Sequence, residues 1–137
     1  MAWKNYPPYM AKKESKYKSK KVTVDGLEFA SRKEAKRWTE LRILEKAGAI
    51  SDLKTQVKFV LVPAQREADQ VGARGGIKKG KTIERECAYI ADFTYLDSKG
   101  ELHVEDVKGY KGGGAYEVFK IKRKLMLYIH KIKVEEV

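Results

Sequence analysis

The stretch ADFTYLDSKGELHVEDVK, residues 91–108, decides the fold predicted for this chain. Two runs rich in β-branched and aromatic residues flank a short polar segment, which predicts two antiparallel strands joined by a tight turn. Gly100 suits the left-handed position that closes a type I turn followed by a bulge. This turn fixes the register of the strand pair and places Asp92 directly opposite Asp106.

Asp92 and Asp106 would repel each other as opposed carboxylates on one face of a strand pair. A divalent cation between them would turn the repulsion into ligation, because hard cations such as magnesium prefer carboxylate oxygens. Lys108 lies two residues beyond Asp106 and therefore projects from the same face. Glu105 points to the opposite face and is not predicted as a ligand. The hairpin thus predicts a site for metal-assisted chemistry on phosphate.

A helix is predicted over residues 32–47, upstream of the hairpin. Ser31 is a suitable N-cap, and Glu34 follows three residues later as in a capping box. Trp38 and Leu41 share a helix face with Glu34, so this carboxylate lies toward the buried side. Glu34 therefore has two interpretations, as a cap residue or as a third carboxylate of the metal site.

The remaining pattern predicts an α/β sandwich in the order helix, three strands, helix, strand. Residues 22–29 are expected to form a short hairpin, residues 48–56 a connection, and residues 64–84 a long polar, glycine-rich loop. Further elements are expected as strands over 57–62, 86–96, 102–108 and 131–137, and as a helix over 116–130.

Asp92 together with residues 106–108 resembles the motif of the PD-(D/E)XK nuclease superfamily, with Ala91 where the family has proline. Glu34 matches the glutamate that this family carries on its first helix. The resemblance extends from about Val22 onward and is closest to small phage-encoded members and to Holliday-junction-resolvase-like and transposon-end endonucleases. It implies a restriction-endonuclease-like αβββαβ core, in which helices flank a mixed central sheet.

The resemblance also implies a magnesium-dependent endodeoxyribonuclease, with manganese as an alternative cofactor. In that family pattern Asp92 and Asp106 bind the metal, with the Val107 carbonyl as a further ligand. Glu34 binds it directly or through water, and Lys108 orients the attacking water. Branched DNA such as a Holliday junction, phage DNA recombination and a homodimer are implied by the resemblance alone.

Composition favours a nucleic-acid partner. The chain has 137 residues, 42% of them hydrophobic, which fits one folded domain with an adequate core. Its net charge of +11 points to a polyanion. Residues 1–21 hold seven lysines and one glutamate and are predicted to be a flexible basic arm before a single nuclease-like domain over 22–137. No apolar run approaches a membrane span, and the single Cys87 excludes an internal disulfide, so we expect an intracellular protein. The family resemblance implies that the cell is bacterial or phage-infected.

Basic residues predicted to contact nucleic acid fall into three groups. One group lies in the N-terminal arm, one in the 64–84 loop, expected to be a flexible basic flap over DNA, and one around the last helix. A tail ordered by chance packing, a disordered hairpin tip and ordinary solvated charges are the respective alternatives. The predicted contacts are Lys12, Lys13, Lys16, Lys18, Lys20, Arg74, Lys78, Lys79, Lys81, Lys111, Lys120 and Lys124.

The main rival to a nuclease is a non-catalytic module that binds DNA or RNA. Its basic segments would suffice for binding, because neutralised phosphates release counterions. Asp92 and Asp106 count against it, since carboxylates within a basic surface weaken phosphate binding unless a metal is present. A small ribosome-associated or structural protein is a third, weaker interpretation.

Overall fold

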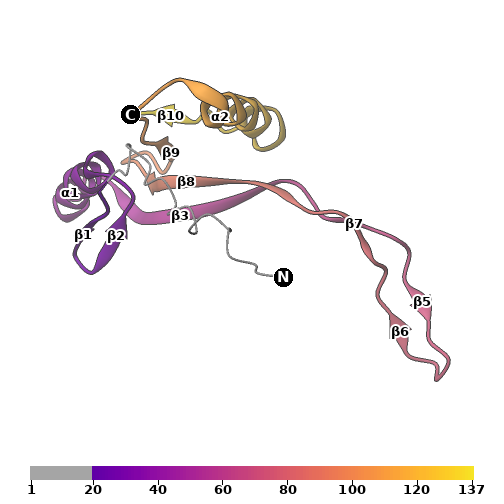
Figure 1. Cartoon of the computed structure of the whole chain (residues 1–137). Helices are drawn as coiled ribbons and strands as arrows, with labels where there is room; N and C mark the ends of the chain where they lie inside the picture. The colour runs from indigo at the N-terminus through magenta and orange to yellow at the C-terminus, as the bar shows by residue number, and fades with distance from the viewer. Residues whose placement is uncertain (1–19) are drawn as a thin grey trace, which may run out of the picture.

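The computed structural model describes residues 20–137. Within this range a four-stranded sheet forms the centre of the protein (Figure 1). Its strand order is β10-β9-β8-β3; β10 runs parallel to β9, and the other neighbours are antiparallel. The prediction of an α/β protein with a mixed sheet is therefore confirmed. The strands are β3 (Ser51–Val62), β8 (Cys87–Leu96), β9 (Leu102–Asp106) and β10 (Glu135–Glu136).

The β8–β9 hairpin has the register that its turn predicts. Leu96 pairs with Leu102, and Phe93 pairs with Glu105. Gly100 has a φ of 79°, the left-handed conformation expected of it, and its amide donates to the Asp97 carbonyl over 3.0 Å. Continuing the ladder by one residue brings Asp92 opposite Asp106.

Two helices cover opposite sides of the sheet and divide the core in two (Figure 1). Helix α1 (Arg32–Lys46) follows the predicted hairpin of β1 (Val22–Val24) and β2 (Leu27–Phe29), and packs Trp38 and Leu41 against Phe93. Helix α2 (Gly113–Leu125) and the π-helical turn η1 (Met126–His130) bury Phe119 and Met126 in the second cluster. The order of these main elements along the chain is helix, three strands, helix, strand, as expected.

Several predicted boundaries are wrong. Residues 51–56, expected in a connection, belong to β3. The start of this strand is irregular, so the sequence pattern does not indicate it. Asp52 and Gln56 both have left-handed φ values of 54° and 52°, and the register shifts between Ser51 and Lys54. Helix α2 begins at Gly113, three residues before the predicted start at residue 116, and the last strand is much shorter than residues 131–137.

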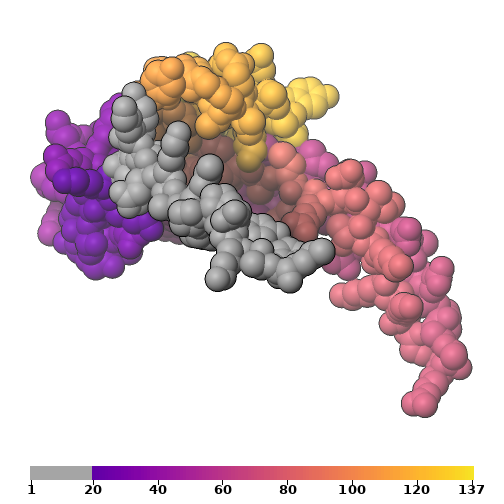
Figure 2. All heavy atoms as spheres, in the orientation of Figure 1, coloured from indigo at the N-terminus to yellow at the C-terminus, as the bar shows by residue number. Residues whose placement is uncertain are grey.

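The 64–84 segment is a two-stranded arm and not the flexible loop that its composition predicts. It continues the β3–β8 ladder outward and projects from the body (Figures 1 and 2). Two short antiparallel ladders build it, first β4 (Gln65–Arg66) with β7 (Thr82–Glu84), then β5 (Gln70–Val71) with β6 (Ile77–Lys78).

No helix within residues 20–137 is long and apolar enough to cross a membrane.

Candidate active site

Three elements bring the four predicted catalytic residues together. Glu34 lies in the first turn of α1, Asp92 in the middle of β8, and Asp106 and Lys108 at the end of β9. The short parallel strand β10 holds this end of β9 in place. The Val137 amide donates to the Asp106 carbonyl over 2.9 Å, and the Lys108 amide donates to the Val137 carbonyl over 3.1 Å.

Asp106 is the most enclosed of these carboxylates, with 6% of its surface exposed. Its Oδ1 forms an ion pair with Lys108 Nζ at 2.7 Å, and its Oδ2 accepts a hydrogen bond from the Tyr89 hydroxyl at 2.7 Å. Lys108 Nζ also lies 3.6 Å from the centre of the Phe119 ring, a cation–π contact. Asp106 is thus fixed by a cation on one oxygen and a neutral donor on the other.

Asp92 is half-buried, and its carboxylate contacts neutral donors. Its Oδ2 accepts from the Val107 amide at 2.8 Å, while Gln56 Nε2 lies 3.4 Å from Oδ1. The pKa of Asp92 is raised to about 6, mainly by burial and also by the charges of Asp106 and Glu34, while the Val107 amide and Lys108 act to lower it. A pKa near 6 means that the protein partners of Asp92 do not make up for its loss of solvent and for the neighbouring carboxylates.

Glu34 fulfils both interpretations of the sequence in part. Its amide donates to Ser31 Oγ over 3.1 Å, as an N-cap requires, and its Oε2 accepts from the Ala30 amide at 3.3 Å. Burial raises the pKa of Glu34, the Ala30 amide lowers it, and the nearby Asp106 carboxylate raises it. Glu34 therefore acts as a cap residue while its charge also acts on the acidic pair.

Two residues at the site, Gln56 and Tyr89, were not predicted to belong to it. Gln56, within the segment predicted as a connection, is exposed, and its amide contacts Asp92 from a left-handed backbone position. Such conformations cost about 1 kcal/mol for a residue with a Cβ and cluster at functional sites. The pattern of apolar and polar residues along a strand does not indicate a left-handed φ at a residue such as Gln56.

Tyr89 was missed because the side chains of β8 change sides at Asp92. Tyr89 and Ala91 pack in the α2 cluster, whereas Phe93 and Tyr95 pack in the α1 cluster, although all four have odd numbers. Strict alternation of side chains along a strand would place Tyr89 on the same side as Phe93. The change of side lets the Tyr89 hydroxyl reach Asp106.

The donor set fits a hard divalent cation in its chemistry, because three carboxylates act on one another and Lys108 is the cation paired with Asp106. Within residues 20–137, however, no group of three or more His, Cys, Asp or Glu side chains has the arrangement of a metal site. The carboxylate oxygens of Asp92 and Asp106 are occupied by protein donors. Metal binding by these residues, by Glu34 and by the Val107 carbonyl stays a prediction.

The predicted nucleic-acid contacts are placed unevenly. Lys12, Lys13, Lys16 and Lys18 lie outside the described residues. Lys111 pairs with Glu136 at 3.2 Å, and Lys120 pairs with Glu117 at 2.7 Å, so both have partners of their own. The remaining predicted residues are exposed, and they are Lys20, Arg74, Lys78, Lys79, Lys81 and Lys124.

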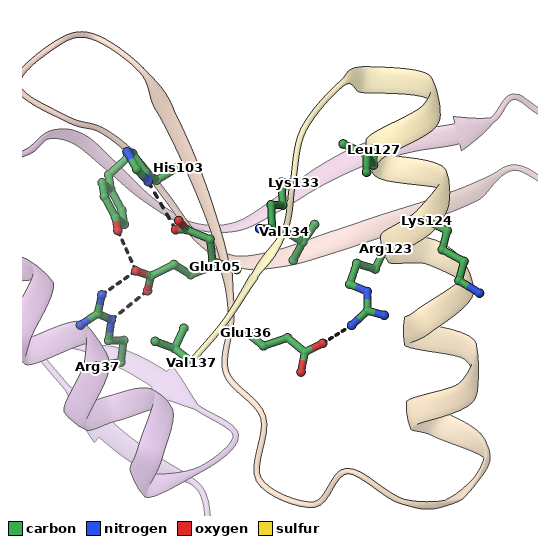
Figure 3. A pocket seen from close by; sticks show the side chains of 12 residues that line it. Arg37, His103, Glu105, Arg123, Lys124, Leu127, Lys133, Val134, Glu136 and Val137 are labelled. Atoms are coloured by element: carbon green, nitrogen blue, oxygen red, sulfur yellow. Dashed lines mark hydrogen bonds and ion pairs between the residues drawn. The ribbon is translucent and has the colours of Figure 1, made fainter.

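A separate cavity of about 890 Å³ opens between α1, β9, β10 and α2 (Figure 3). None of the four predicted catalytic residues lines it. Glu105, which indeed faces away from Asp106, lies on its wall with 2% of its surface exposed and accepts from Arg37 at 2.8 and 2.5 Å. Arg123 similarly pairs with Glu136. Because these charges compensate one another, the cavity offers less reactive chemistry than the Asp92 site.

A family comparison covers nearly the entire chain. Residues 14–135 match the family described as "Protein of unknown function (DUF1064)". The chain belongs to the DUF1064 family. The matched range contains Glu34, the β8–β9 hairpin and the arm, so the four predicted catalytic residues and the arm belong to the family domain. Comparisons with curated proteins and with solved structures gave no significant match.

Proposed function

We propose that this protein is a metal-dependent endodeoxyribonuclease that hydrolyses phosphodiester bonds at the Asp92–Asp106 site. The observation that carries the proposal is the convergence of Glu34, Asp92 and Asp106 around Lys108, with the pKa of Asp92 raised to about 6. A fold keeps such repelling, partly buried carboxylates at a cost in stability. Binding of a divalent cation would offset that cost.

Each residue has a role that its contacts support. A bound magnesium or manganese ion would lower the pKa of a water molecule and offset charge on the phosphate oxygens. Asp92 and Asp106 would hold this ion, with the Val107 carbonyl adjacent and Glu34 in direct or water-mediated reach. Lys108 would exchange its ion pair with Asp106 for a phosphate oxygen or the attacking water.

Tyr89 and Gln56 are positioning residues in this proposal. The Tyr89 hydroxyl fixes one oxygen of Asp106 and so orients the carboxylate without adding charge. Gln56 supplies the weakest contact in the site, at 3.4 Å from Asp92 Oδ1. This contact is the one that an incoming cation would displace most readily.

The net charge of +11 supports DNA as the partner, and the family resemblance supports branched DNA, phage DNA recombination or processing, and a homodimer as finer proposals. A non-catalytic nucleic-acid-binding module is the second candidate, favoured by the basic surface. It gives no reason for the acidic pair.

An activity screen tests the proposal. The protein is incubated with linear, nicked, flapped and four-way DNA in magnesium, in manganese and in chelator. Cleavage that requires the divalent metal supports a nuclease, and the substrate that is cut fastest identifies its preferred structure. Binding to all substrates without cleavage in either metal would favour the non-catalytic module.

A further inference from the structure

The two-stranded arm, which together with its flanking residues covers 63–86, has no core of its own. Apart from Gly72 and Gly80, which are partly covered, every residue of the arm is exposed. Its shape is nevertheless defined by backbone contacts. The Glu67 amide donates to the Lys81 carbonyl over 2.9 Å, and the Gly80 amide donates to Asp69 Oδ1 over 2.9 Å.

Gly80 marks a bend that only glycine permits. A Cβ at this position would lie 1.8 Å from the Glu67 carbonyl oxygen, so a larger residue would force the two strands apart. Beyond the bend the strands pair again through Val71 and Ile77, and the turn closes where the Gly72 amide donates to the Gly76 carbonyl over 2.7 Å. The arm is thus a bent two-stranded ribbon with a defined shape. Its outer half, residues 70–79 beyond the bend, is called the tip.

Charge is separated along the arm. Acidic residues occur only toward its base, where Glu67, Asp69, Glu84 and Glu86 lie. The tip beyond the bend, residues 70–79, contains no acidic residue. Three basic residues of the tip are exposed, and they are Arg74, Lys78 and Lys79. Lys81 is also exposed but lies on the inner side of the bend, where its carbonyl accepts from the Glu67 amide.

The tip also presents an apolar pair. Val71 and Ile77 are cross-strand partners and are 79% and 77% exposed. Exposure of these two apolar side chains to water is unfavourable. In a DNA groove the same side chains would contact base edges, sugars and thymine methyl groups. The combination favours a nucleic-acid partner over an apolar protein surface, because the flanking charges are all positive.

We propose that the arm is a duplex-reading element whose ribbon tip lies in a groove of B-form DNA between one and two helical turns from the candidate active site. The major groove is about 12 Å wide and admits a two-stranded ribbon. Val57 pairs with Ala91, next to Asp92, and residues 57–74 span at most roughly 56 Å, which is between one and two turns of B-DNA. Because the deep major groove of A-form RNA is too narrow for side-chain entry, the inference also specifies DNA.

This inference rests on the proposed function only in taking DNA as the partner, and its test is performed in chelator so that no cleavage occurs. Binding to duplexes of about 10 and about 25 base pairs is titrated at several salt concentrations. The short duplex cannot engage the body and the tip together. The parent should therefore show a steeper salt dependence on the long duplex, by roughly one unit of slope for each additional phosphate that the tip neutralises.

The decisive variant combines Lys78→Ala and Lys79→Ala, both at exposed positions of the tip. It should lose the excess slope on the long duplex while keeping the slope on the short one. A matched control combines Lys46→Ala and Lys99→Ala, two exposed positions outside the arm, and should keep the excess. Equal slopes of the parent on both duplexes, or equal losses in both variants, would overturn the inference.

A second variant, Val71→Ser with Ile77→Ser, tests the apolar contact. It should weaken binding to the long duplex about tenfold without changing the slope. Self-association of the parent through this pair in the absence of DNA, with no excess slope, would assign the arm to protein contacts and overturn the inference. If the protein cleaves DNA but shows no excess slope, only the proposed role of the arm is overturned. If it shows the excess slope but never cleaves DNA, the role of the arm stands and the nuclease proposal is overturned.

Discussion

Replacing Asp92 with asparagine should make the metal-free protein more stable, because burial and neighbouring carboxylates disfavour the charged form of Asp92 in the folded protein. Burial and neighbouring charges raise the pKa of Asp92 from 3.8 to about 6. The folded state therefore binds a proton more tightly than the unfolded state does. Stability decreases as pH rises from 3.8 to about 6 and stays at the lower level above that pH.

The magnitude follows from the same shift. Two pKa units correspond to about 3 kcal/mol of unfolding free energy, which is the upper limit of the gain expected for Asp92→Asn at pH 7.5. An asparagine Oδ1 can still accept from the Val107 amide, so the main contact of the side chain persists. At pH 4 the gain should nearly disappear, because the native carboxylate is then protonated in the folded protein.

Urea unfolding at pH 4, 5.5 and 7.5, in chelator, measures this difference. Asp97→Asn in the same hairpin is the matched control. The pKa of Asp97 is lowered, first by its hydrogen bond with His103, so its replacement should destabilise the protein at neutral pH. If Asp92→Asn were destabilising at pH 7.5, or if its effect did not depend on pH, the reasoning about repelling carboxylates would be refuted.

Three further changes test other parts of the account. Arg37→Ala leaves Glu105 buried without its cation and should cost about 3 kcal/mol in urea unfolding, even though neither residue is predicted to take part in cleavage. Tyr89→Phe removes the donor to Asp106 and should cost about 1 kcal/mol in stability, and in a cleavage assay it should slow a nuclease without abolishing it. The carboxylate partners of His103 raise its pKa above 6.5, so they contribute stability that is fully present below pH 6.5 and lost as pH rises through the folded value; His103→Ala should flatten the stability curve in this range.

The hairpin and the first helix could be predicted because each rests on local rules, whereas the mixed sheet was implied by the family resemblance. Gly100 fixed the turn and therefore the strand register, and Ser31 marked the start of α1. The pairing of Asp92 with Asp106 followed from that register, since directly opposed residues can be read from a turn of known length.

The parts that sequence did not reveal depend on backbone conformations that residue type does not dictate. Gln56 has a left-handed φ without being glycine, and near it β8 changes sides, so Tyr89 reaches Asp106 against the alternation rule. The arm was predicted to be a loop because glycine and lysine are poor strand formers. Only the pairing of its two halves, continuing β3 and β8, makes it a ribbon.

The most direct test of the central claim compares DNA cleavage and DNA binding by the parent and by Asp106→Asn. Asparagine preserves the size of the side chain and removes the charge that a metal requires. In magnesium the parent should cut DNA and the variant should lose cleavage by orders of magnitude, since the metal supplies several kcal/mol of transition-state stabilisation. In chelator the variant should bind DNA at least as tightly as the parent does. Equal cleavage by both proteins would contradict the proposed active site, and no cleavage by the parent on any substrate would contradict the proposed function.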